Sequence, residues 1–486
     1  MRTVIEVQKL KREILVYLIK AFYSNDFAEN VRLIPYDMRP KGSPVPFRCC
    51  IHKERAILRS RTLAGLGLAI EDDNERAELS VYAAQALRRT SNAENPLTVL
   101  QSACQGCVES FIHVTDLCQN CVAKSCINSC KFGAIKTTRG RASIDSAKCK
   151  KCRLCIKACP YQAIVKTIVP CENACPTGAI AKDRGGLACI DTAKCISCGR
   201  CVVTCPFGAI HNKSQIIDVL KKIQDRKKVV AMIAPALLGQ MSCAAGQLHS
   251  ALKKSGFTLV YEVAQGAEIT ARAEAQDLAE RLQKGDAFMT TSCCSAYNEL
   301  VKKHLPEIRP FVSRTQTPLH YTAEIVRREQ PDAVNVFISP CLSKFTEARQ
   351  DPNIDHVLTF EEIGALFTAL NIKPEELPEE NFAYNSAREA RGFALSGGVA
   401  RSVQAAWTGD PAAVKPALLN GLPKTALNEL RAYAQQGRCP AGNLLEIMCC
   451  EGGCANGPAV ISAGKSAAAR IEKYAAAAVS LTGSQI

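Results

Sequence analysis

Residues 149–160 read CKKCRLCIKACP and residues 195–206 read CISCGRCVVTCP. Both follow the spacing Cys-x2-Cys-x2-Cys-x3-Cys-Pro, and a looser version occurs between residues 118 and 130. Three thiolates at gaps of two residues can wrap one face of an iron–sulfur cubane and leave its fourth iron for a more distant ligand. Because residues 104–205 hold 17 of the 27 cysteines, this region must fold around what the cysteines bind rather than around an aliphatic core.

The cysteine runs predict ligand sets for several 4Fe-4S clusters. In bacterial ferredoxins the last cysteine of each run binds the cluster of the other run. Exchanging the last cysteines of the first two runs gives two sets: Cys118, Cys121, Cys126 and Cys159 for the first cluster, and Cys149, Cys152, Cys155 and Cys130 for the second. The third set takes its distant ligand from a separate Cys-Pro pair: Cys195, Cys198, Cys201 and Cys175. The thiols that remain could close a fourth cluster: Cys104, Cys107, Cys171 and Cys205.

Zinc is the alternative metal for paired cysteines. Zinc sites use two pairs a dozen or more residues apart, whereas these triplets with a trailing Cys-Pro fit cubanes better. Cys189 is left over as a spare thiol. His113 could replace a thiolate in the fourth cluster, although a structural histidine is the better expectation.

Composition limits the kind of protein. With 486 residues, 47% of them hydrophobic and 22% charged, the chain should form about three folded domains rather than a disordered polymer. No run of about 18 uncharged apolar residues occurs, so no membrane span is expected. A signal peptide is not expected either, because the apolar stretch at residues 14–22 contains Lys20 and lacks a small-residue cleavage site. These features favour the cytoplasm, where thiols stay reduced and 27 cysteines indicate metal rather than disulfides.

The formal charge of +15 could indicate a nucleic-acid partner. Each cubane with four thiolates adds about −2, however, so five cubanes reduce the charge to about +5. The basic residues therefore balance bound clusters, and no nucleic-acid partner is expected. The remaining positive charge would suit docking of an acidic ferredoxin.

We expect an α+β fold in four parts: a helical region at 1–95, a ferredoxin-like domain with two clusters at 96–167, a second ferredoxin-like module at 168–214, and an α/β domain with mixed sheets flanked by helices at 215–486. The periodicity of apolar residues predicts helices at 10–22, 48–70, 267–282 and 467–479, and strands at 229–234, 259–263 and 334–338. A linker is expected at 91–96 and a surface loop at 374–385.

Four segments stand out in the last part: APALLGQ (234–240), TSCCSAY (291–297), SPCLSKFTE (339–347) and EIMCCEGGCANG (446–457). The last three resemble the signatures of the FeFe (iron-only) hydrogenases, TSCCPxW, MPCxxKxxE and ExMxCxxGCxxG, in the same order. The chain is similar to a divergent monomeric subgroup with ferredoxin-like clusters in its N-terminal half.

The resemblance implies an H-cluster, which is a 4Fe-4S cubane bridged to a two-iron subsite carrying CO, cyanide and a dithiolate. The implied cubane ligands are Cys294, Cys341, Cys450 and Cys454, with Cys454 as the bridge. The other implied roles are proton delivery by Cys293, a hydrogen bond to cyanide from Lys344, packing against the two-iron unit by Met448, a carboxylate of the proton route at Glu347, and a hydroxyl at Thr317. Glycines in EGGC and at 397–398 are expected to permit close backbone approach to the cofactor.

The chain also departs from the family pattern. Ser295, Tyr297, Ser339 and Cys449 replace the usual Pro, Trp, Met and Ala. The family has two relay glutamates, and neither has a clear match in this sequence. Glu268 and Glu274 are both candidates. Cys243 and Cys439 lie outside any motif, and the adjacent Cys49 and Cys50 are assigned no site.

The leading interpretation is a hydrogenase, an oxidoreductase that interconverts 2 H⁺ + 2 e⁻ and H2. Heterolytic cleavage of H2 requires an open metal site and an adjacent base. A ferredoxin-type carrier is the expected electron partner, maturation proteins would insert the two-iron unit, and a monomer or simple oligomer is expected. The alternatives are an H2 sensor with low turnover and an iron–sulfur electron-transfer or assembly protein without the two-iron unit.

Overall fold

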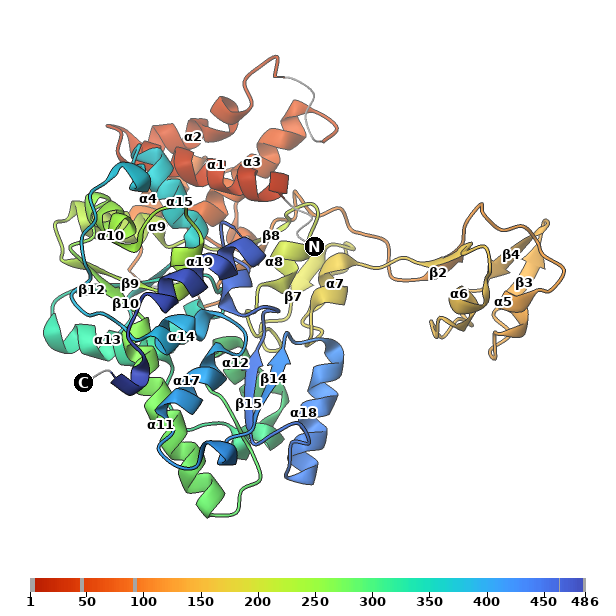
Figure 1. The fold of residues 1–486 in the computed structure, drawn as a ribbon. Helices are drawn as coiled ribbons and strands as arrows, with labels where there is room; N and C mark the ends of the chain where they lie inside the picture. The colour runs from red at the N-terminus through yellow and green to blue at the C-terminus, as the bar shows by residue number, and fades with distance from the viewer. Residues whose placement is uncertain (1–4, 44–47, 91–93, 463, 484–486) are drawn as a thin grey trace.

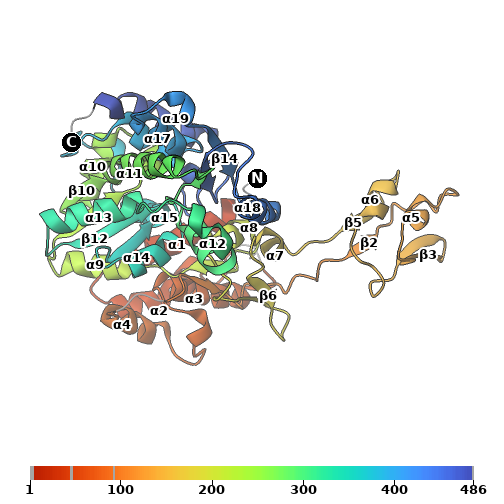
Figure 2. The same cartoon turned by 90° about the horizontal axis from the view of Figure 1, so that it is seen from below.

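The computed structural model describes residues 5–43, 48–90, 94–462 and 464–483. Most of the chain forms one body, and a smaller module made mainly of residues 108–168 projects from it (Figures 1 and 2). None of the helices in the described ranges has an apolar stretch long enough to cross a membrane.

Four helices form the N-terminal region: α1 (Ile5–Phe22), α2 (Phe27–Met38), α3 (Ile51–Gly65) and α4 (Leu79–Arg88). The helices predicted at 10–22 and 48–70 are confirmed as α1 and α3, the latter beginning and ending inside the predicted range. Helix α1 packs against α15 (Phe360–Ala369) of the last domain, and Lys11 Nζ lies 2.7 Å from Glu361 Oε2. Residues 91–93 of the predicted linker lie outside the described residues.

The cysteine-rich region is built from short antiparallel pairs. Strand β1 (Leu97–Val99) pairs with β8 (Ile210–Asn212), so the start of this region lies beside its end, in the body. Between them the body also holds four short elements: α7 (Pro170–Ala174), β6 (Ile180–Lys182), β7 (Ala188–Ile190) and α8 (Arg200–Thr204). The projecting module contains six: β2 (Ile112–Val114), α5 (Ser125–Asn128), β3 (Ile135–Thr138), β4 (Arg141–Ile144), α6 (Leu154–Ala158) and β5 (Ile164–Lys166).

Two sheets organise the last domain. The first has the order β10-β9-β12-β13 and the second β11-β15-β14. Their strands are β9 (Val229–Ile233), β10 (Leu259–Glu262), β11 (Met289–Thr290), β12 (Val334–Ser339), β13 (His356–Thr359), β14 (Pro416–Asn420) and β15 (Leu444–Met448). The strands predicted at 229–234, 259–263 and 334–338 are confirmed.

The expected α+β class is confirmed, but the expectation of mixed sheets in this domain is corrected. Every strand pair in both sheets is parallel. The physical reason is connectivity, because helices cross over between consecutive strands and bring each strand back in the same direction. All five residues of β9 are buried, as expected for a parallel strand covered on both faces.

Helices cover both sheets (Figures 1 and 2). The helices of this domain are α9 (Ile216–Gln224), α10 (Ala245–Lys254), α11 (Ala264–Gln283), α12 (Ser295–His304), α13 (Pro318–Glu329), α14 (Lys344–Gln350), α15, α16 (Arg388–Arg391), α17 (Gly398–Ala406), α18 (Lys424–Gln436) and α19 (Lys465–Ala476). The predicted helices at 267–282 and 467–479 correspond to α11 and α19. The predicted loop at 374–385 contains one 3-10 turn, Pro374–Glu376, and otherwise irregular backbone.

Candidate active site and cluster-binding sites

The four cysteines expected to hold the cubane lie where parallel strands end. Cys294 caps α12 four residues after β11, Cys341 follows β12 by two residues, and Cys450 follows β15 by two. Cys454 begins a 3-10 turn shortly after Cys450. The carboxyl ends of parallel strands meet at one edge of a sheet, which is the usual place for a ligand site in such folds.

These four thiols lie close enough to influence one another. Burial raises the pKa of Cys450 well above its usual value, and nearby Cys341, Cys454 and Cys294 raise it further. Burial likewise raises the pKa of Cys454 to about 12, with Cys341 and Cys294 adding to the effect. Four thiols this close together could serve as the donor set of a 4Fe-4S cubane, whose irons would stabilise the thiolates that burial otherwise disfavours.

A cavity of about 80 Å³ adjoins these cysteines. Cys293, Cys341 and Cys454 line it, together with Met448 and Lys344. The remaining lining is mostly apolar: Ala234, Pro235, Ala236, Val263, Ala267, Pro318, Leu319, Phe337, Ser339, Pro340, Phe393 and Ala394. A space beside Cys454, with one cation in an otherwise apolar wall, fits an anionic group such as a two-iron unit with cyanide ligands.

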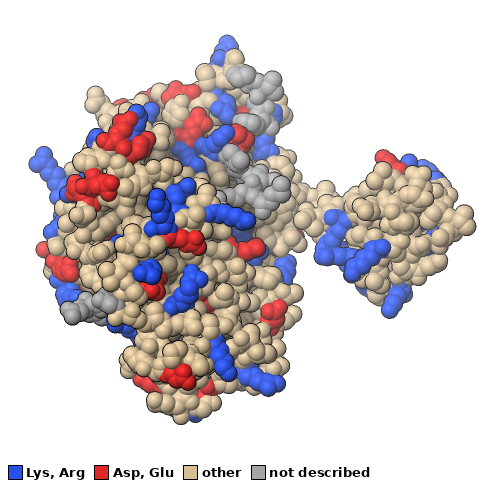
Figure 3. Space-filling view, viewed as in Figure 1, with Lys and Arg blue, Asp and Glu red and all other residues tan. Residues whose placement is uncertain are grey.

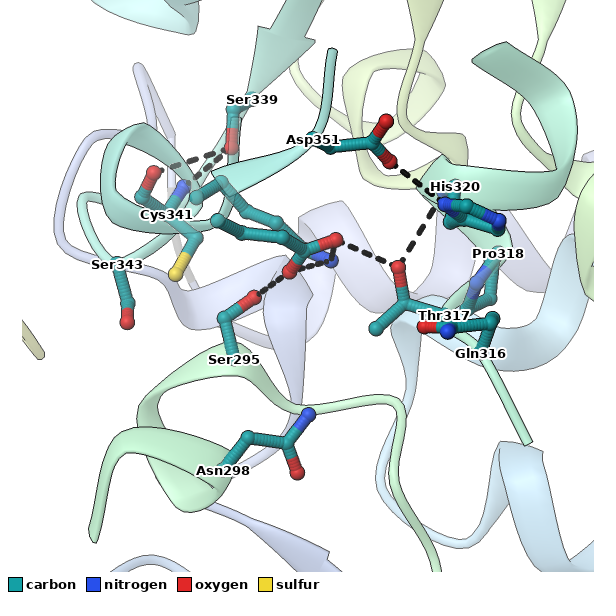
Figure 4. Close-up of polar contacts among 12 residues, drawn as sticks. Ser295, Asn298, Gln316, Thr317, Pro318, His320, Ser339, Cys341, Ser343 and Asp351 are labelled. Atoms are coloured by element: carbon teal, nitrogen blue, oxygen red, sulfur yellow. Dashed lines mark hydrogen bonds and ion pairs between the residues drawn. The ribbon is translucent and has the colours of Figure 1, made fainter. Parts of the chain in front are cut away.

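Lys344 extends from the first turn of α14 and is held by Glu347 one turn later. The ammonium Nζ lies 2.8 Å and 2.7 Å from the two carboxylate oxygens. Thr317 Oγ1 donates to Glu347 Oε1 at 2.5 Å, and Ser295 Oγ donates to Oε2 (Figure 4). The structure therefore brings Lys344, Glu347 and Thr317 together, and it adds Ser295, the residue that replaces the family's proline.

A polar cavity of about 310 Å³ lies on the other side of Glu347. Thr317, Glu347, His320 and Asp351 are among its lining residues. His320 Nδ1 lies 2.7 Å from Asp351 Oδ2, and the His320 backbone N–H donates to Thr317 Oγ1 (Figure 4). Polar contacts thus continue from Lys344, in the wall of the apolar cavity, to the polar cavity. Sequence reasoning missed His320 and Asp351, which lie outside the family motifs.

Cys293 has a buried carboxyl group as its neighbour. Glu274 of α11 is fully buried, and its Oε1 accepts hydrogen bonds from Ser292 N at 3.0 Å and Ser292 Oγ at 3.3 Å. Its Oε2 is buried and has no hydrogen-bond partner among the residues that the structure describes. Burial raises the pKa of Glu274 to about 7. Burial also raises the pKa of Cys293 well above its usual value, and the next largest cause is Glu274.

The second candidate relay residue, Glu268, has different surroundings. Its Oε2 accepts from Tyr384 Oη at 2.9 Å and its Oε1 from Ala387 N at 2.6 Å. Both hydrogen bonds tie α11 to the segment before α16. Of the two candidates, Glu274 is therefore the one that lies beside Cys293, and Glu268 has a structural role.

Asp277 lies between Glu274 and the surface. Sequence reasoning did not identify it as a candidate site residue. It lies one turn after Glu274 on α11 and contributes to the raised pKa of that residue. Its Oδ1 accepts from Arg314 Nε at 3.0 Å and Arg281 Nε at 3.2 Å. The Arg314 side chain is 61% exposed. The three-residue spacing from Glu274 places both acids on one helix face, which is the signal that could have identified Asp277.

The other departures from the family pattern also have structural explanations. Ser339 accepts a hydrogen bond from Cys341 N at 3.0 Å, so it fixes the turn that presents this ligand. Tyr297 is fully buried with its hydroxyl 2.9 Å from Thr290 Oγ1. Cys449 hydrogen-bonds Cys294. This hydrogen bond is the largest of the effects that lower the pKa of Cys294, which falls to about 6.

Glycines in this region allow backbone segments to touch. A Cβ at Gly453, where φ is +84°, would lie 2.6 Å from Ala394 O, and one at Gly398 would lie 2.0 Å from Gly392 O. These glycines therefore permit close approach of the backbone around residues 392–396. The sequence instead predicts close approach to the cofactor itself.

The structure also gathers the predicted ligands of the third and fourth clusters. The thiols of Cys195, Cys198 and Cys201 each have a pKa raised by burial and, in part, by Cys175. The four thiols assigned to the fourth cluster by elimination line one cavity: Cys104, Cys107, Cys171 and Cys205. Cys171 also influences Cys201, so these two sites are neighbours.

In the projecting module, one cavity is lined by the first ligand set: Cys118, Cys121, Cys126 and Cys159. For the second set, Cys149 and Cys152 influence Cys155, and Cys130 packs in the same small core as Cys155. His113 lies on β2 with its Nδ1 3.3 Å from Thr167 Oγ1 and does not line the cavity of the fourth set.

The cysteines without an assigned role occupy scattered positions. Cys189 is exposed on β7, and Cys439 is buried in the core under α18. Cys243 is half-buried, and burial raises its pKa to about 11. Cys49 and Cys50 are exposed, with their sulfurs 3.8 Å apart.

The third cluster loop packs directly on the candidate active site. Ser343 Oγ donates to Ile196 O at 3.1 Å, and Thr346 Oγ1 donates to Ser197 Oγ at 3.3 Å. A Cβ at Gly199 would lie 2.7 Å from Pro458. Cys198 is also close enough to raise the pKa of Cys449 and Cys450. The cysteines predicted to hold the third cluster, the fourth cluster and the cubane therefore form a continuous series.

Comparison with known proteins agrees with this geometry. Residues 227–458 match the family described as "Iron only hydrogenase large subunit, C-terminal domain". Residues 167–216 match an "LdpA Fe-S cluster-binding domain" and residues 141–164 a "4Fe-4S binding domain". The fold and the sites thus define an iron–sulfur protein. More particularly, residues 227–458, just under half of the chain, are similar to the iron-only hydrogenases, and two further regions match iron–sulfur-binding domains.

Among curated proteins, the chain is 26% identical over 207 residues to the NADP-reducing hydrogenase subunit HndD of Solidesulfovibrio fructosivorans, covering 36% of this chain and 35% of that one. It is 27% identical over 178 residues to iron hydrogenase 1 of Clostridium pasteurianum (32% and 30%). It is 26% identical over 206 residues to the cytosolic Fe-S cluster assembly factor NAR1 of Yarrowia lipolytica (35% and 41%). The matches to the two hydrogenases span about a third of the length of each.

Among solved structures, a variant of the FeFe hydrogenase HydA1 from Chlamydomonas reinhardtii matches with a TM-score of 0.44 and 21% identity. The match covers 54% of this chain and 88% of that one.

Proposed function

We propose that this protein is a hydrogenase that interconverts 2 H⁺ + 2 e⁻ and H2. The observation that carries the proposal is the apolar cavity that Cys293, Lys344, Met448 and Cys454 line together. When bound there, the two-iron unit would supply an open iron site at which H2 is formed and split. Cys294, Cys341, Cys450 and Cys454 would hold the adjoining cubane, with Cys454 bridging to the two-iron unit.

The chain's own residues would position the cofactor and exclude water. Lys344 would donate a hydrogen bond to a cyanide ligand, and its pairing with Glu347 keeps the ammonium in the cavity wall. Met448 is buried and would pack against the two-iron unit. Because the charge of Lys344 is partly balanced by Glu347, the apolar cavity does not contain an unpaired ion.

A proton route follows from the contacts of Cys293. The thiol would exchange a proton with the cavity, and Glu274 would exchange it with the thiol. Asp277, Arg281 and Arg314 lie between Glu274 and the surface. Glu274 suits this role because a carboxyl group with a pKa near 7 is both a donor and an acceptor at neutral pH.

Electrons would reach the cubane through the ferredoxin-like clusters. Cys198 is close enough to raise the pKa of Cys449 and Cys450, and Cys171 is close enough to raise that of Cys201, which supports a path from the fourth site through the third. A ferredoxin-type carrier is the proposed external partner, and maturation proteins would insert the two-iron unit.

The experiment that tests the proposed function is infrared spectroscopy of chain matured with the two-iron unit, together with iron analysis. We expect bands from metal-bound CO and cyanide, and about 22 irons per chain from five cubanes and two further irons. A matured preparation with full cubane content and no such bands would contradict the hydrogenase proposal.

The similarity to an Fe-S cluster assembly factor supports one other candidate, an iron–sulfur protein that lacks the two-iron unit. That function would require the cubane cysteines but not the apolar cavity with Cys293, Lys344 and Met448 beside it. About 20 irons without the infrared bands is its expected signature. An H2 sensor would instead show the bands with low turnover.

The fourth cluster has a separate test. Replacing Cys171 by alanine is expected to remove about four irons per chain, because Cys171 lines one cavity with Cys104, Cys107 and Cys205. Cys189→Ala is the matched control, since this thiol is exposed on β7 and is expected to bind nothing. Iron and sulfide analysis measures both variants. An unchanged iron content in Cys171→Ala would refute this ligand assignment.

A further inference from the structure

Exposed apolar side chains are concentrated on the projecting module. Thirteen large apolar side chains are exposed among the described residues, and eight of them lie between residues 108 and 168. These eight are Val108, Leu117, Val122, Phe132, Leu154, Tyr161, Val165 and Ile168. The module is about an eighth of the chain but carries more than half of these exposed side chains. Such an excess indicates a surface that binds another molecule.

Three of these side chains either line the first cluster site or directly adjoin one of its cysteines in the chain. Leu117 precedes Cys118 and is 60% exposed, and Val122 follows Cys121 and is 98% exposed. Tyr161 is 51% exposed and lines the cavity formed by the ligands of this cluster. The chain thus leaves uncovered apolar groups directly beside a redox site, where contact with another protein would shorten the distance for electron transfer.

The same module is strongly basic. Residues 108–168 contain eleven Lys and Arg against three Asp and Glu, a surplus of eight. Two bound cubanes at about −2 each would leave a surplus of about four. Lys and Arg side chains border an uncharged area on its visible face (Figure 3). Lys124 lines the cavity of the first ligand set. Arg141, which pairs with the exposed Asp116, directly precedes Ala142, whose N–H donates to Cys118 Sγ at 3.5 Å.

The attachment of the module leaves this surface accessible. Two chain segments join it to the body, and they are held together by Ser110 Oγ, which donates to Thr167 O at 2.9 Å, and Thr167 N, which donates to Phe111 O at 2.9 Å. Both views show the module extending away from the remaining domains (Figures 1 and 2). A partner of protein size can therefore reach it without displacing any element.

We propose that Leu117, Val122, Tyr161, Lys124 and Arg141 form a docking surface for a small acidic electron-carrier protein. The proposal rests on the proposed function, since it names the place where that function exchanges electrons. On docking, the reduced centre of the carrier loses one electron and the first cluster gains it. The apolar side chains supply the desolvated contact, while the basic residues select an acidic partner and accelerate its association.

The test is stopped-flow reduction of the cluster-loaded full chain, with an acidic ferredoxin as the probe and dithionite as a small reference reductant. The quantity compared is the rate ratio, which is the second-order rate constant for reduction by ferredoxin divided by that for dithionite. In Lys124→Glu/Arg141→Glu we expect this ratio to fall at least about tenfold. The wild-type rate constant should also fall steeply as salt is added, because screening weakens electrostatic steering. Val122→Ser, which changes no charge, should weaken ferredoxin binding without altering the salt dependence.

A matched control changes the same charge elsewhere. Lys227→Glu/Lys228→Glu alters two exposed lysines that precede β9 in the body, and its ratio should stay within about twofold of the wild type. Equal losses in both double variants, or no loss in Lys124→Glu/Arg141→Glu at full iron content, would overturn the docking surface. Reduction of the clusters does not require the two-iron unit, so failure of the hydrogenase proposal would appear separately, as missing infrared bands.

Discussion

Replacing Cys293 by alanine is expected to reduce H2 turnover at least about a hundredfold while the infrared bands of the two-iron unit remain. Cys293 lines the apolar cavity but is not one of the four proposed cubane ligands, so its loss should leave the cofactor bound. General acid–base catalysis by a positioned group contributes about 10² to 10⁴ in rate. A hundredfold loss corresponds to about 2.7 kcal/mol in activation free energy.

Turnover should be measured with a small dye as the electron donor, so that docking of a protein carrier does not limit the rate. Cys243→Ala is the matched control, because Cys243 is also half-buried with a raised pKa but lies outside the cavity. Cys293→Ser should lose nearly as much activity as Cys293→Ala, since a hydroxyl is a much weaker acid than a thiol. Wild-type rates in Cys293→Ala, with the infrared bands intact, would refute proton delivery by this residue.

Glu274→Gln is expected to lower H2 turnover about a hundredfold without unfolding the protein. The glutamine carbonyl can still accept the hydrogen bond from Ser292 N, but an amide cannot exchange a proton near neutral pH. The control is Glu268→Gln on the same helix. Glu268 is also buried and hydrogen-bonded, but its partners are Tyr384 and Ala387. The H2 turnover of Glu268→Gln should stay within about twofold of the wild type.

The pH profile separates a relay from a structural carboxyl group. With a pKa of about 7, Glu274 holds a proton below this pH and loses it above, so H2 production should decline as the pH rises through about 7. This inflection should disappear in Glu274→Gln and persist in Glu268→Gln. Identical pH profiles for the wild type and Glu274→Gln would show that protons take another route.

The same shift predicts a change in stability. Because folding raises the pKa of Glu274, its contribution is fully present below the unfolded value of 4.5 and declines as the pH rises to about 7. The decline amounts to at most about 3 kcal/mol. Glu274→Gln should therefore be less sensitive to pH than the wild type in chemical unfolding between pH 5 and 8.

The sequence predicted those parts of the site in which the ligands are close in the chain. Runs such as residues 149–160 carry three ligands at fixed gaps, and a short chelating loop needs little information from the remainder of the fold. The motif at residues 339–347 likewise contains Cys341, Lys344 and Glu347 within two turns of chain. The buried strands were also predictable, because β9 is a continuous apolar run.

The choice between Glu268 and Glu274 could not be made from the sequence. Both lie on α11 and both are buried, and they differ only in what approaches them. Ser292 and Cys293 reach Glu274 after β11, whereas Tyr384 and Ala387 reach Glu268 from a segment more than a hundred residues away. The parallel order of both sheets was missed for a similar reason, since strand direction depends on crossover connections rather than on local periodicity.

The sequence by itself determined which cysteines occur in cluster-binding runs and which motifs belong to the catalytic region, because those patterns are local. Only the tertiary structure decided that Glu274 adjoins Cys293, that Cys198 adjoins Cys449 and Cys450, and that Leu117 and Val122 are exposed on a separate module. Each of these depends on contacts, or on their absence, between segments far apart in the chain. Burial and neighbouring charge, which set pKa values and docking, arise only when those segments are brought together.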